Sequence, residues 1–209
     1  SQTVKKVRSP KYMGSFRYEH TGLRWIVRHG KSIIPFIKDG SVFERASKAF
    51  FRLFKTNIKQ EFATYVRMAE LNMLFVYMPL HFQPERTTSP QGDVYVDQIL
   101  MIKTLAAALP DGWSMFVKEH PIQWLPHGSQ FTPYRYEGYY KTIAGLPNVR
   151  LIPIETDTFE LIKKAQAVVT ATGIPGLEAL LHGVPVLAFG YPWYMHSPGL
   201  FLVSSVSEC

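Results

Sequence analysis

Three polar clusters, each directly after an apolar run, hold the side chains best suited to chemistry. They close the segments Phe116-Val-Lys-Glu-His-Pro121, Thr170-Ala-Thr-Gly-Ile-Pro-Gly-Leu-Glu178 and Val184-Pro-Val-Leu-Ala-Phe-Gly190. Apolar runs that stop abruptly at polar or glycine residues are typical of buried parallel strands at their carboxyl ends. Ligands of open α/β sheets bind in the crevice outside those ends. We therefore expect the functional site at this edge of the sheet.

The first cluster combines a lysine, a glutamate and a histidine. Pro121 keeps the chain from continuing as strand or helix, so it holds His120 at the rim of the sheet. His120 supplies a proton-switchable donor and Lys118 a fixed cation, with Glu119 between them. Such donors bind phosphate, and we predict a phosphate contact here. The alternative for an isolated His-Pro pair is a loop histidine without a ligand.

The second cluster predicts an anion site at the start of a helix. Gly173 and Gly176 allow a close backbone approach, Thr170 and Thr172 supply hydroxyls, and helix-start N–H groups point to the same spot. The segment lacks the Gly-Lys-Ser/Thr of a P-loop and the Gly-x-Gly-x-x-Gly of dinucleotide sites, which disfavours NAD. Glu178, on an early turn of the helix, is expected to accept ribose hydroxyls. Its alternative is a charge that the helix dipole favours.

A further group follows the first apolar run. His81, Gln83 and Glu85 alternate along the chain, so in an extended loop they point the same way, towards the same rim. Glu85 would act as a base or accept a sugar hydroxyl, and its alternative is an exposed loop charge. We take Glu85 and His120 as the candidate catalytic residues. No spacing of histidines or paired carboxylates indicates a metal, so we expect a metal-independent site without a cofactor.

The elements that position these groups alternate along the chain. Apolar runs at 73–78, 113–118, 149–153, 167–170 and 184–189 predict five strands. Helical patterns at 94–109, 134–146, 157–165 and 174–182 separate them. This alternation predicts an α/β fold, a Rossmann-like parallel sheet with flanking helices and right-handed crossovers. We place this domain at residues 72–209.

Residues 1–71 are predicted to be a basic linking and helical segment. Residues 1–60 hold 14 Lys and Arg against 3 Asp and Glu, whereas residues 61–209 hold 9 against 13. Helices are expected at 42–55 and 58–70. The first has phenylalanines on one side and basic residues on the other, namely Phe43, Phe50 and Phe54 against Arg45, Lys48, Arg52 and Lys55. Residues 41–56 would suit an anionic membrane surface, or the phenylalanines pack on the α/β domain and the charges are solvated. Nucleic acid is disfavoured as a partner.

The cysteine content and the absence of long apolar runs bear on the expected cellular location. Its one cysteine, Cys209, excludes a disulfide framework and fits a reducing compartment. No run approaches the roughly 18 apolar residues of a membrane span, and no signal peptide opens the chain. We expect a cytoplasmic protein, peripheral at the inner membrane face if residues 41–56 bind lipid. Since the sequence does not begin with Met, we expect it to be a piece of a longer protein.

The order of the motifs resembles the capsule polysaccharide biosynthesis family, which includes the Kdo transferases of bacterial capsule assembly. The motifs are Pro-Leu-His-Phe-Gln-Pro-Glu (79–85), Val-Lys-Glu-His-Pro (117–121), Thr-Gly-x-x-Gly-Leu-Glu-Ala-Leu (172–180) and Gly-x-Pro-Val-Leu-x-Phe-Gly (183–190), then Tyr194. The resemblance covers about residues 72–200 and implies the donor-binding half of a GT-B type glycosyltransferase. It implies a nucleotide-sugar donor, with a CMP-sugar such as CMP-Kdo favoured, and a glycan or glycolipid acceptor.

The resemblance also assigns residues. It maps His120 and Pro121 as donor-phosphate contacts, and Thr172, Gly173, Gly176 and Glu178 as the Thr/Gly/Glu segment of the donor site. The sequence departs from the family pattern at Ile174-Pro175, where a small residue or Thr is usual after Thr-Gly. It also has no room for a complete first Rossmann domain, so acceptor-side residues are expected outside it.

Two other function classes stay open. A sugar-nucleotide 2-epimerase of similar fold would need carboxylate acid and base residues at the reacting carbon, and no such pair is evident. A non-enzymatic adaptor would use the basic segment to bind membrane or nucleic acid and the α/β domain as a scaffold. Fold alone does not choose among them. The donor-site motifs favour the two enzymes over the adaptor, and the absence of an evident acid/base pair favours the glycosyltransferase over the epimerase.

Overall fold

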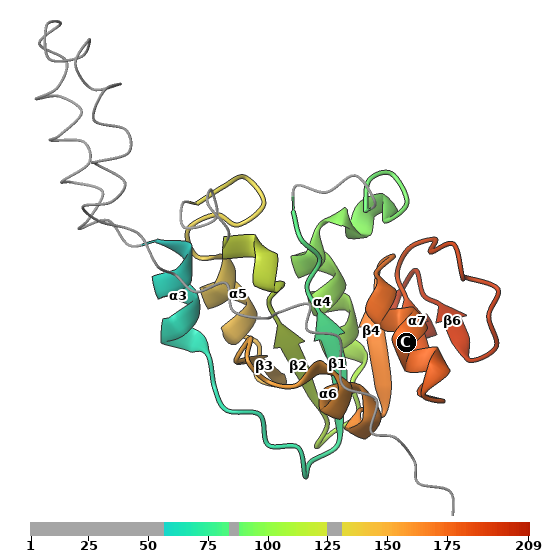
Figure 1. The fold of residues 1–209 in the computed structure, drawn as a ribbon. Coiled ribbons are helices and arrows are strands. Elements are labelled where there is room, and N and C mark those ends of the chain that lie inside the picture. Colours follow the sequence, from blue (N-terminus) through green and yellow to red (C-terminus); the bar gives the residue numbers. More distant parts are fainter. Residues whose placement is uncertain (1–56, 84–87, 125–130) are drawn as a thin grey trace, which may run out of the picture. The chain divides into compact units, whose positions relative to one another are not determined.

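A parallel sheet forms the centre of the protein (Figure 1). The computed structural model describes residues 57–83, 88–124 and 131–209, which all fall in the compact unit Thr56–Cys209. The six strands are β1 (Phe75–Pro79), β2 (Ser114–Lys118), β3 (Val149–Ile152), β4 (Ala167–Thr170), β5 (Val186–Ala188) and β6 (Leu200–Leu202). Their order is β3-β2-β1-β4-β5-β6, and every neighbouring pair is parallel. The predicted Rossmann-like fold is confirmed.

The sixth strand was not predicted. It spans Leu200–Leu202 and forms the outer edge of the sheet, with Phe201 more than half exposed. Gly199 precedes it with φ of 85°, a left-handed conformation that favours glycine. The strand order reverses direction between β1 and β4, which therefore flank the topological switch point of the sheet.

Helices cover both faces of the sheet. The helical elements are α3 (Ile58–Tyr65), η1 (Asp93–Val96), α4 (Gln98–Ala108), η2 (Pro121–Trp124), α5 (Tyr139–Ala144), α6 (Thr158–Lys164), α7 (Ile174–Leu181) and η3 (Val206–Glu208). One core cluster joins α3, α4 and α5 to the strand residues Val76, Met78 and Val117. The other joins α6 and α7 to Phe75, Tyr77 and Phe116. Alternate strand residues thus serve opposite faces, as the pleat requires.

Two predicted helices are shorter than expected. The helix predicted at 94–109 divides at Asp97, whose carboxylate accepts the N–H groups of Ile99 and Leu100 and so starts α4. The helix predicted at 134–146 begins only at Tyr139, after Gly138 with φ of 90°. Local propensity did not reveal these stops, because side-chain caps and a left-handed glycine set them.

The helix predicted at 58–70 also ends early, and it packs on the α/β domain. It stops at Tyr65, because the chain becomes extended at Val66 and the Arg67 N–H donates to the Leu151 carbonyl in β3. Ile58 and Phe62 lie in the core. Glu61 caps α5, accepting the N–H groups of Gly138 and Tyr140 at 3.0 and 2.9 Å. This helix therefore belongs to the α/β domain and not to the N-terminal segment predicted at 1–71.

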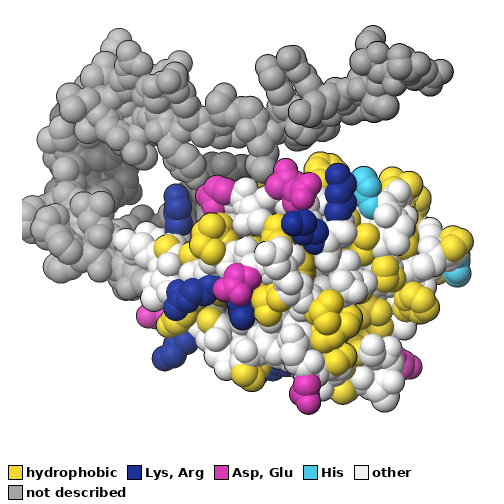
Figure 2. Space-filling view, turned by 90° about the horizontal axis from the view of Figure 1, so that it is seen from below, with side chains coloured by type: hydrophobic (Ala, Val, Ile, Leu, Met, Phe, Trp, Pro, Cys, Tyr) yellow, Lys and Arg dark blue, Asp and Glu magenta, His cyan; other side chains and the backbone are white. Residues whose placement is uncertain are grey.

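The prediction of a membrane surface as partner rests mainly on the N-terminal segment. The helix predicted at 42–55 and the candidate membrane segment 41–56 lie outside the described residues. None of the helices in the described ranges is long and apolar enough to cross a membrane. On the face shown in Figure 2, basic and acidic side chains of the described residues are interspersed, and no extended patch of one sign forms there.

Candidate functional site

A cavity of about 370 Å³ opens at the carboxyl ends of β1, β2 and β4, beside the switch point of the sheet. We call it the switch-point cavity. Its walls come from the chain after β1, from His120, from the start of α7 and from two more distant residues. The lining is Pro79, Leu80, His81, Phe82, Gln91, His120, Thr172, Gly173, Ile174, Pro175 and Trp193. Segments far apart in the sequence therefore meet where the strand-end motifs predicted a site.

His81 lies at the back of this cavity and is 7% exposed. Its Nε2 accepts the Ala171 N–H at 3.1 Å and lies 3.2 Å from the Thr170 hydroxyl. Those bonds leave the proton of the neutral ring on Nδ1. Burial, together with the nearby charges of His120 and Arg135, lowers the pKa of His81 to about 4. At neutral pH the ring is an uncharged positioning group that ties β1 to the β4–α7 turn.

The two glycines of the Thr/Gly segment make room for protein side chains. A Cβ on Gly173 would lie 2.7 Å from Cε1 of His81 and 3.0 Å from Oγ1 of Thr170. A Cβ on Gly176 would collide with the hydroxyl of Tyr194, which donates to the Gly173 carbonyl. The close approaches predicted at these positions are therefore made by His81 and Tyr194, and they hold the start of α7 in place.

The start of α7 offers fewer donors than the sequence suggested. The Gly173 N–H donates to Thr170 Oγ1 at 2.9 Å, and Pro175, at the second helical position, has no N–H. Thr170 is fully buried and holds this turn, whereas Thr172 lines the cavity. Thr172 is therefore the hydroxyl of the pair that a ligand in the cavity can meet.

His120 lies at the rim of the cavity and is partly buried. Its Nδ1 accepts the Ile122 N–H at 3.2 Å, which places the proton of the neutral ring on Nε2. Pro121 begins the 3₁₀ turn η2, and this turn supplies that N–H. The turn that begins at Pro121 therefore orients the His120 ring through this bond.

Lys118 points away from the cavity. Its Nζ donates to the Thr156 carbonyl at 2.5 Å and to Thr158 Oγ1 at 2.8 Å, at the start of α6. Burial lowers its pKa, while the charges of Asp157 and Glu155 act in the opposite direction. Lys118 and Phe116 share one face of β2, so the pleat directs this lysine to the α6 layer. It anchors the loop between β3 and α6.

Glu119 belongs to a buried network centred on Arg135. Both side chains are fully buried, and Arg135 Nε donates to Glu119 Oε2 at 2.8 Å. Arg135 also donates to Gln83 Oε1 at 2.8 Å and to the His81 carbonyl at 3.0 Å, and the Tyr140 hydroxyl donates to Glu119. Burial alone would lower the pKa of Arg135, but the Glu119 carboxylate raises it. We call these residues the arginine network.

The remaining predicted residues are dispersed. Gln83 is 5% exposed, and its side chain bonds to Arg135 and to the Val96 carbonyl, so it is part of the arginine network. Glu178 is absent from the cavity lining, and its charge acts on Tyr77, on the α6–α7 face of the sheet. Glu85 lies outside the described residues.

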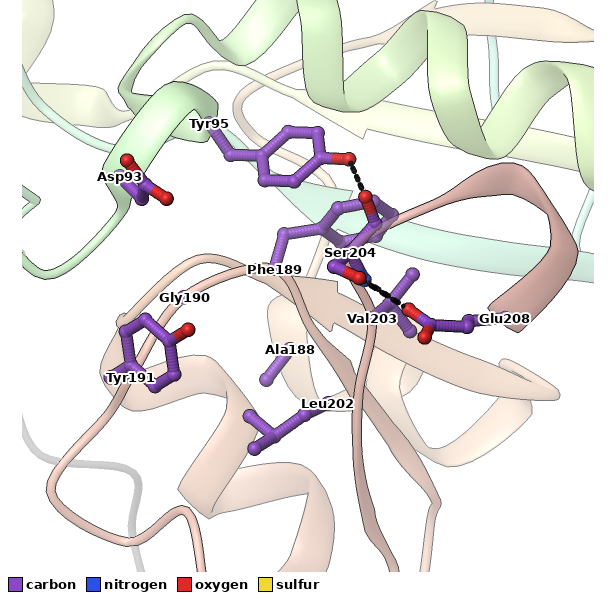
Figure 3. A pocket seen from close by; sticks show the side chains of 10 residues that line it. All are labelled: Asp93, Tyr95, Ala188, Phe189, Gly190, Tyr191, Leu202, Val203, Ser204 and Glu208. Atoms are coloured by element: carbon purple, nitrogen blue, oxygen red, sulfur yellow. Dashed lines mark hydrogen bonds between the residues drawn. The ribbon is translucent and has the colours of Figure 1, made fainter.

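The third strand-end motif lines a second cavity, of about 230 Å³, beside the ends of β5 and β6 (Figure 3). Tyr95 and Phe189 meet edge to face there, and the Tyr95 hydroxyl donates to the Ser204 carbonyl at 2.8 Å. The Ser204 N–H and hydroxyl both donate to Glu208 and lower its pKa. The charged residues that line this second cavity in the described chain are both acidic, Asp93 and Glu208. The cavity therefore does not suit a phosphate.

Sequence reasoning missed three residues of the site region. They are Arg135 in a predicted helix, Gln91 in a predicted loop, and Trp193 after a predicted strand. The sequence signal for Arg135 was its position between two tyrosines, Tyr134 and Tyr136. Trp193 is 74% exposed at the cavity, and its ring meets Tyr194 edge to face at 5.5 Å. Over the described ranges no group of three or more His, Cys, Asp or Glu residues is arranged to hold a metal.

Residues 86–201 match the family model described as capsule polysaccharide biosynthesis protein, and this match covers more than half of the 209 residues. It includes the described residues of the switch-point cavity from Gln91 onward. No curated protein matches the chain.

Two solved structures align with part of this chain. The β-Kdo 2,7 transferase KpsC of Thermosulfurimonas dismutans aligns with a TM-score of 0.50 and 18% identity, over 78% of this chain and 45% of that chain. The UDP-GlcNAc 2-epimerase of Methanocaldococcus jannaschii aligns with a TM-score of 0.42 and 12% identity, over 72% and 40% of the two chains. This chain therefore spans less than half the length of either protein.

Proposed function

The chain belongs to the capsule polysaccharide biosynthesis family, and from this premise we propose that it is the donor-binding part of a glycosyltransferase. The donor is a nucleotide sugar, bound in the switch-point cavity, and the acceptor is a glycan or glycolipid. A CMP-linked sugar such as CMP-Kdo is the favoured donor. Transfer is proposed to proceed without a metal ion.

The observation that carries this proposal is the convergence of His120 and Thr172 on one cavity at the topological switch point. Nucleotides of open α/β sheets bind at such a point. The cavity volume of about 370 Å³ lies within the range of small-molecule sites. Nε2–H of His120 and the hydroxyl of Thr172 are donors suited to phosphate oxygens. Neutral His81 supports the cavity wall without adding charge.

Residues 41–56 add a membrane component to the proposal. Their basic side chains would contribute roughly 1 kcal/mol each near an anionic surface, while the phenylalanines bury apolar area. This would hold the enzyme close to a lipid-linked acceptor. Sedimentation with anionic and neutral liposomes tests it: salt-sensitive binding to the anionic vesicles alone is expected, and its absence at low salt would assign the segment to structural packing.

Calorimetric titration of the purified chain with CMP and with UDP tests the donor assignment. We expect saturable binding of CMP, because a CMP-linked sugar is the proposed donor. UDP differs from CMP in its base and in its number of phosphates, and we expect it to bind more weakly. Adenosine monophosphate serves as the control nucleotide. Equal binding of all three would reject base-specific recognition, and the absence of any binding would reject the proposed function of the cavity.

A further inference from the structure

A separate cavity of about 260 Å³ lies next to the arginine network. Its lining includes Tyr134, Tyr136, Tyr139, Asp97 and Gln83, and we call it the tyrosine cavity. Gln83 lines this cavity whereas His81, two residues earlier, lines the switch-point cavity. The segment after β1 therefore borders both, and the bond from Arg135 to Gln83 supports the wall between them.

Three of the eight residues that line the tyrosine cavity in the described chain are tyrosines. Tyr134 is 42% exposed and Tyr136 is 47% exposed, so ring surface of both remains open to a ligand. Tyr136 meets Tyr139 edge to face, with ring centroids 5.7 Å apart and an interplanar angle of 84°. Tyrosine joins an apolar ring to a polar hydroxyl, and such residues suit ligands with both apolar faces and hydroxyl groups.

Tyr139 is a buried residue in the lining of this cavity. It is 3% exposed, and within the described part of the chain its hydroxyl has no hydrogen-bond partner. Leaving a buried hydroxyl unpaired is costly, so such a group needs an explanation. Burial raises the pKa of Tyr139 above its ordinary value, and the hydroxyl keeps its proton and can donate. Arg135 lies over the ring at 4.5 Å and fixes it in place.

Charge restricts the class of ligand. Asp97 lines the cavity, and one of its oxygens, Oδ1, accepts two N–H groups at the start of α4. A carboxylate at this place disfavours phosphates and acidic sugars, which suit the switch-point cavity instead. The volume of about 260 Å³ lies just below the 300–1,000 Å³ of pockets for drug-sized ligands, so a single ring fits better than an oligosaccharide.

We propose that the tyrosine cavity is a subsite for a neutral sugar ring, which stacks on Tyr136 and accepts a hydrogen bond from the Tyr139 hydroxyl. This inference rests on the proposed function, in which the ring belongs to the glycan acceptor. The cavity lies beside the donor cavity, separated from it by the segment after β1. A neutral sugar would bind in the tyrosine cavity, where Asp97 disfavours a phosphate, and the nucleotide sugar would bind in the switch-point cavity.

Saturation-transfer NMR with the methyl pyranosides of glucose, galactose, mannose and N-acetylglucosamine tests the subsite on the whole chain. We expect binding of at least one, and about five- to tenfold weaker binding by Tyr136→Ala, the effect of one aromatic contact. Tyr191→Ala is the matched control, since Tyr191 is another exposed tyrosine but lines the β5–β6 cavity. Its affinity for the glycosides is expected to equal that of the wild type.

Tyr139→Phe separates a binding role from a structural one. The melting temperature should stay unchanged or rise, because the substitution removes a buried hydroxyl without a described partner, while glycoside binding weakens severalfold. A loss of stability in Tyr139→Phe, or glycoside binding that is absent or insensitive to Tyr136→Ala, would overturn the inference. A CMP titration of the same variants distinguishes the two proposals, because nucleotide affinity should persist when the glycoside site is removed.

Discussion

Glu119 and His120 are neighbours in the sequence, yet they serve two different regions of the molecule. Glu119 is fully buried in the arginine network, where it accepts bonds from Arg135 and Tyr140. His120 is partly buried at the rim of the switch-point cavity and meets the following turn through a bond from Ile122. The backbone N–H of His120 also donates to Glu119 at 2.7 Å, so the two regions are directly linked.

The difference shows how one strand end can supply both a buried support and a residue of the cavity lining. Successive side chains point to opposite sides, and of this pair only His120 lines the switch-point cavity. The buried region holds three loops in a fixed arrangement, with His81, Gln83 and Glu119 attached to one guanidinium. Precise sites need such support from fully bonded neighbours. Substitutions in the buried region should therefore act on folding, and those at the rim on binding.

Glu119→Gln is expected to have the largest effect, a loss of about 3–5 kcal/mol in the free energy of unfolding. It leaves the buried Arg135 charge without its counterion, which is the costly way to break such a pair. Urea denaturation followed by circular dichroism measures it. Glu70→Gln is the control, because Glu70 pairs with Arg150 at 3.5 Å on the surface and should contribute no more than about 1 kcal/mol. Equal losses of unfolding free energy in the two variants would contradict the claim that the buried ion pair stabilises the fold more than the surface pair.

His81→Gln tests the support at the back of the cavity through its pH dependence. Since the pKa of His81 falls from 6.5 to about 4 on folding, the unfolded chain binds a proton between those pH values that the folded chain does not. The contribution of neutral His81 to the free energy of unfolding is therefore complete above pH 6.5. It decreases by up to about 3 kcal/mol as the pH falls to 4.

Glutamine retains an acceptor for the Ala171 N–H but does not titrate, so the variant should lose that part of the pH dependence. Urea denaturation at a series of pH values gives the difference between the two proteins, which cancels the titration of the carboxylates. His182→Gln, at an exposed position, is the control. A difference curve that is flat from pH 4 to 6.5 would contradict the buried neutral state of His81.

His120→Ala is expected to weaken CMP binding by about 1.5–3 kcal/mol, the range for a hydrogen bond to a charged group. Its stability should change little, because the ring is only partly buried. Calorimetry measures the affinity, and His196→Ala, at an exposed position outside the cavity lining, provides the control. Unchanged CMP affinity would remove His120 from the donor site and assign it to the structure of the loop.

Trp193→Ala should have the smallest effect, about 0.5–1.5 kcal/mol on nucleotide-sugar affinity, from the loss of one stacking surface. Stability should stay within about 0.5 kcal/mol, since the ring is 74% exposed. Phe201→Ala, at an exposed position on the edge strand, is the control. If both substitutions leave the affinity unchanged, Trp193 belongs to the surface and not to the cavity.

The predictability of the site differs between its parts. His120, Thr172 and Gly173 were identified because strand ends carry a local signal, an apolar run that stops at polar residues. Lys118 and Glu119 belong to the same motif, but a helix layer and a distant arginine determine where their side chains go. Glu178 lies on an early turn of α7, as predicted from the sequence, but outside the cavity lining. No local pattern contains the pairings of Lys118 and Glu119, because they join residues 16 to 40 positions apart.

By itself, the sequence determined the α/β class, the first five parallel strands, the carboxyl edge as the place of the predicted site, and the family. These properties follow from periodicity and from the order of short motifs, which are local. The tertiary structure alone decided that α3 packs on this domain, that a sixth strand closes the sheet edge, and that Arg135 organises the strand ends. It also decided which strand-end side chains reach the cavity. The physical reason is that burial and hydrogen-bond pairing depend on which segments meet across the sheet. The local sequence of one segment does not specify which distant segments it will contact.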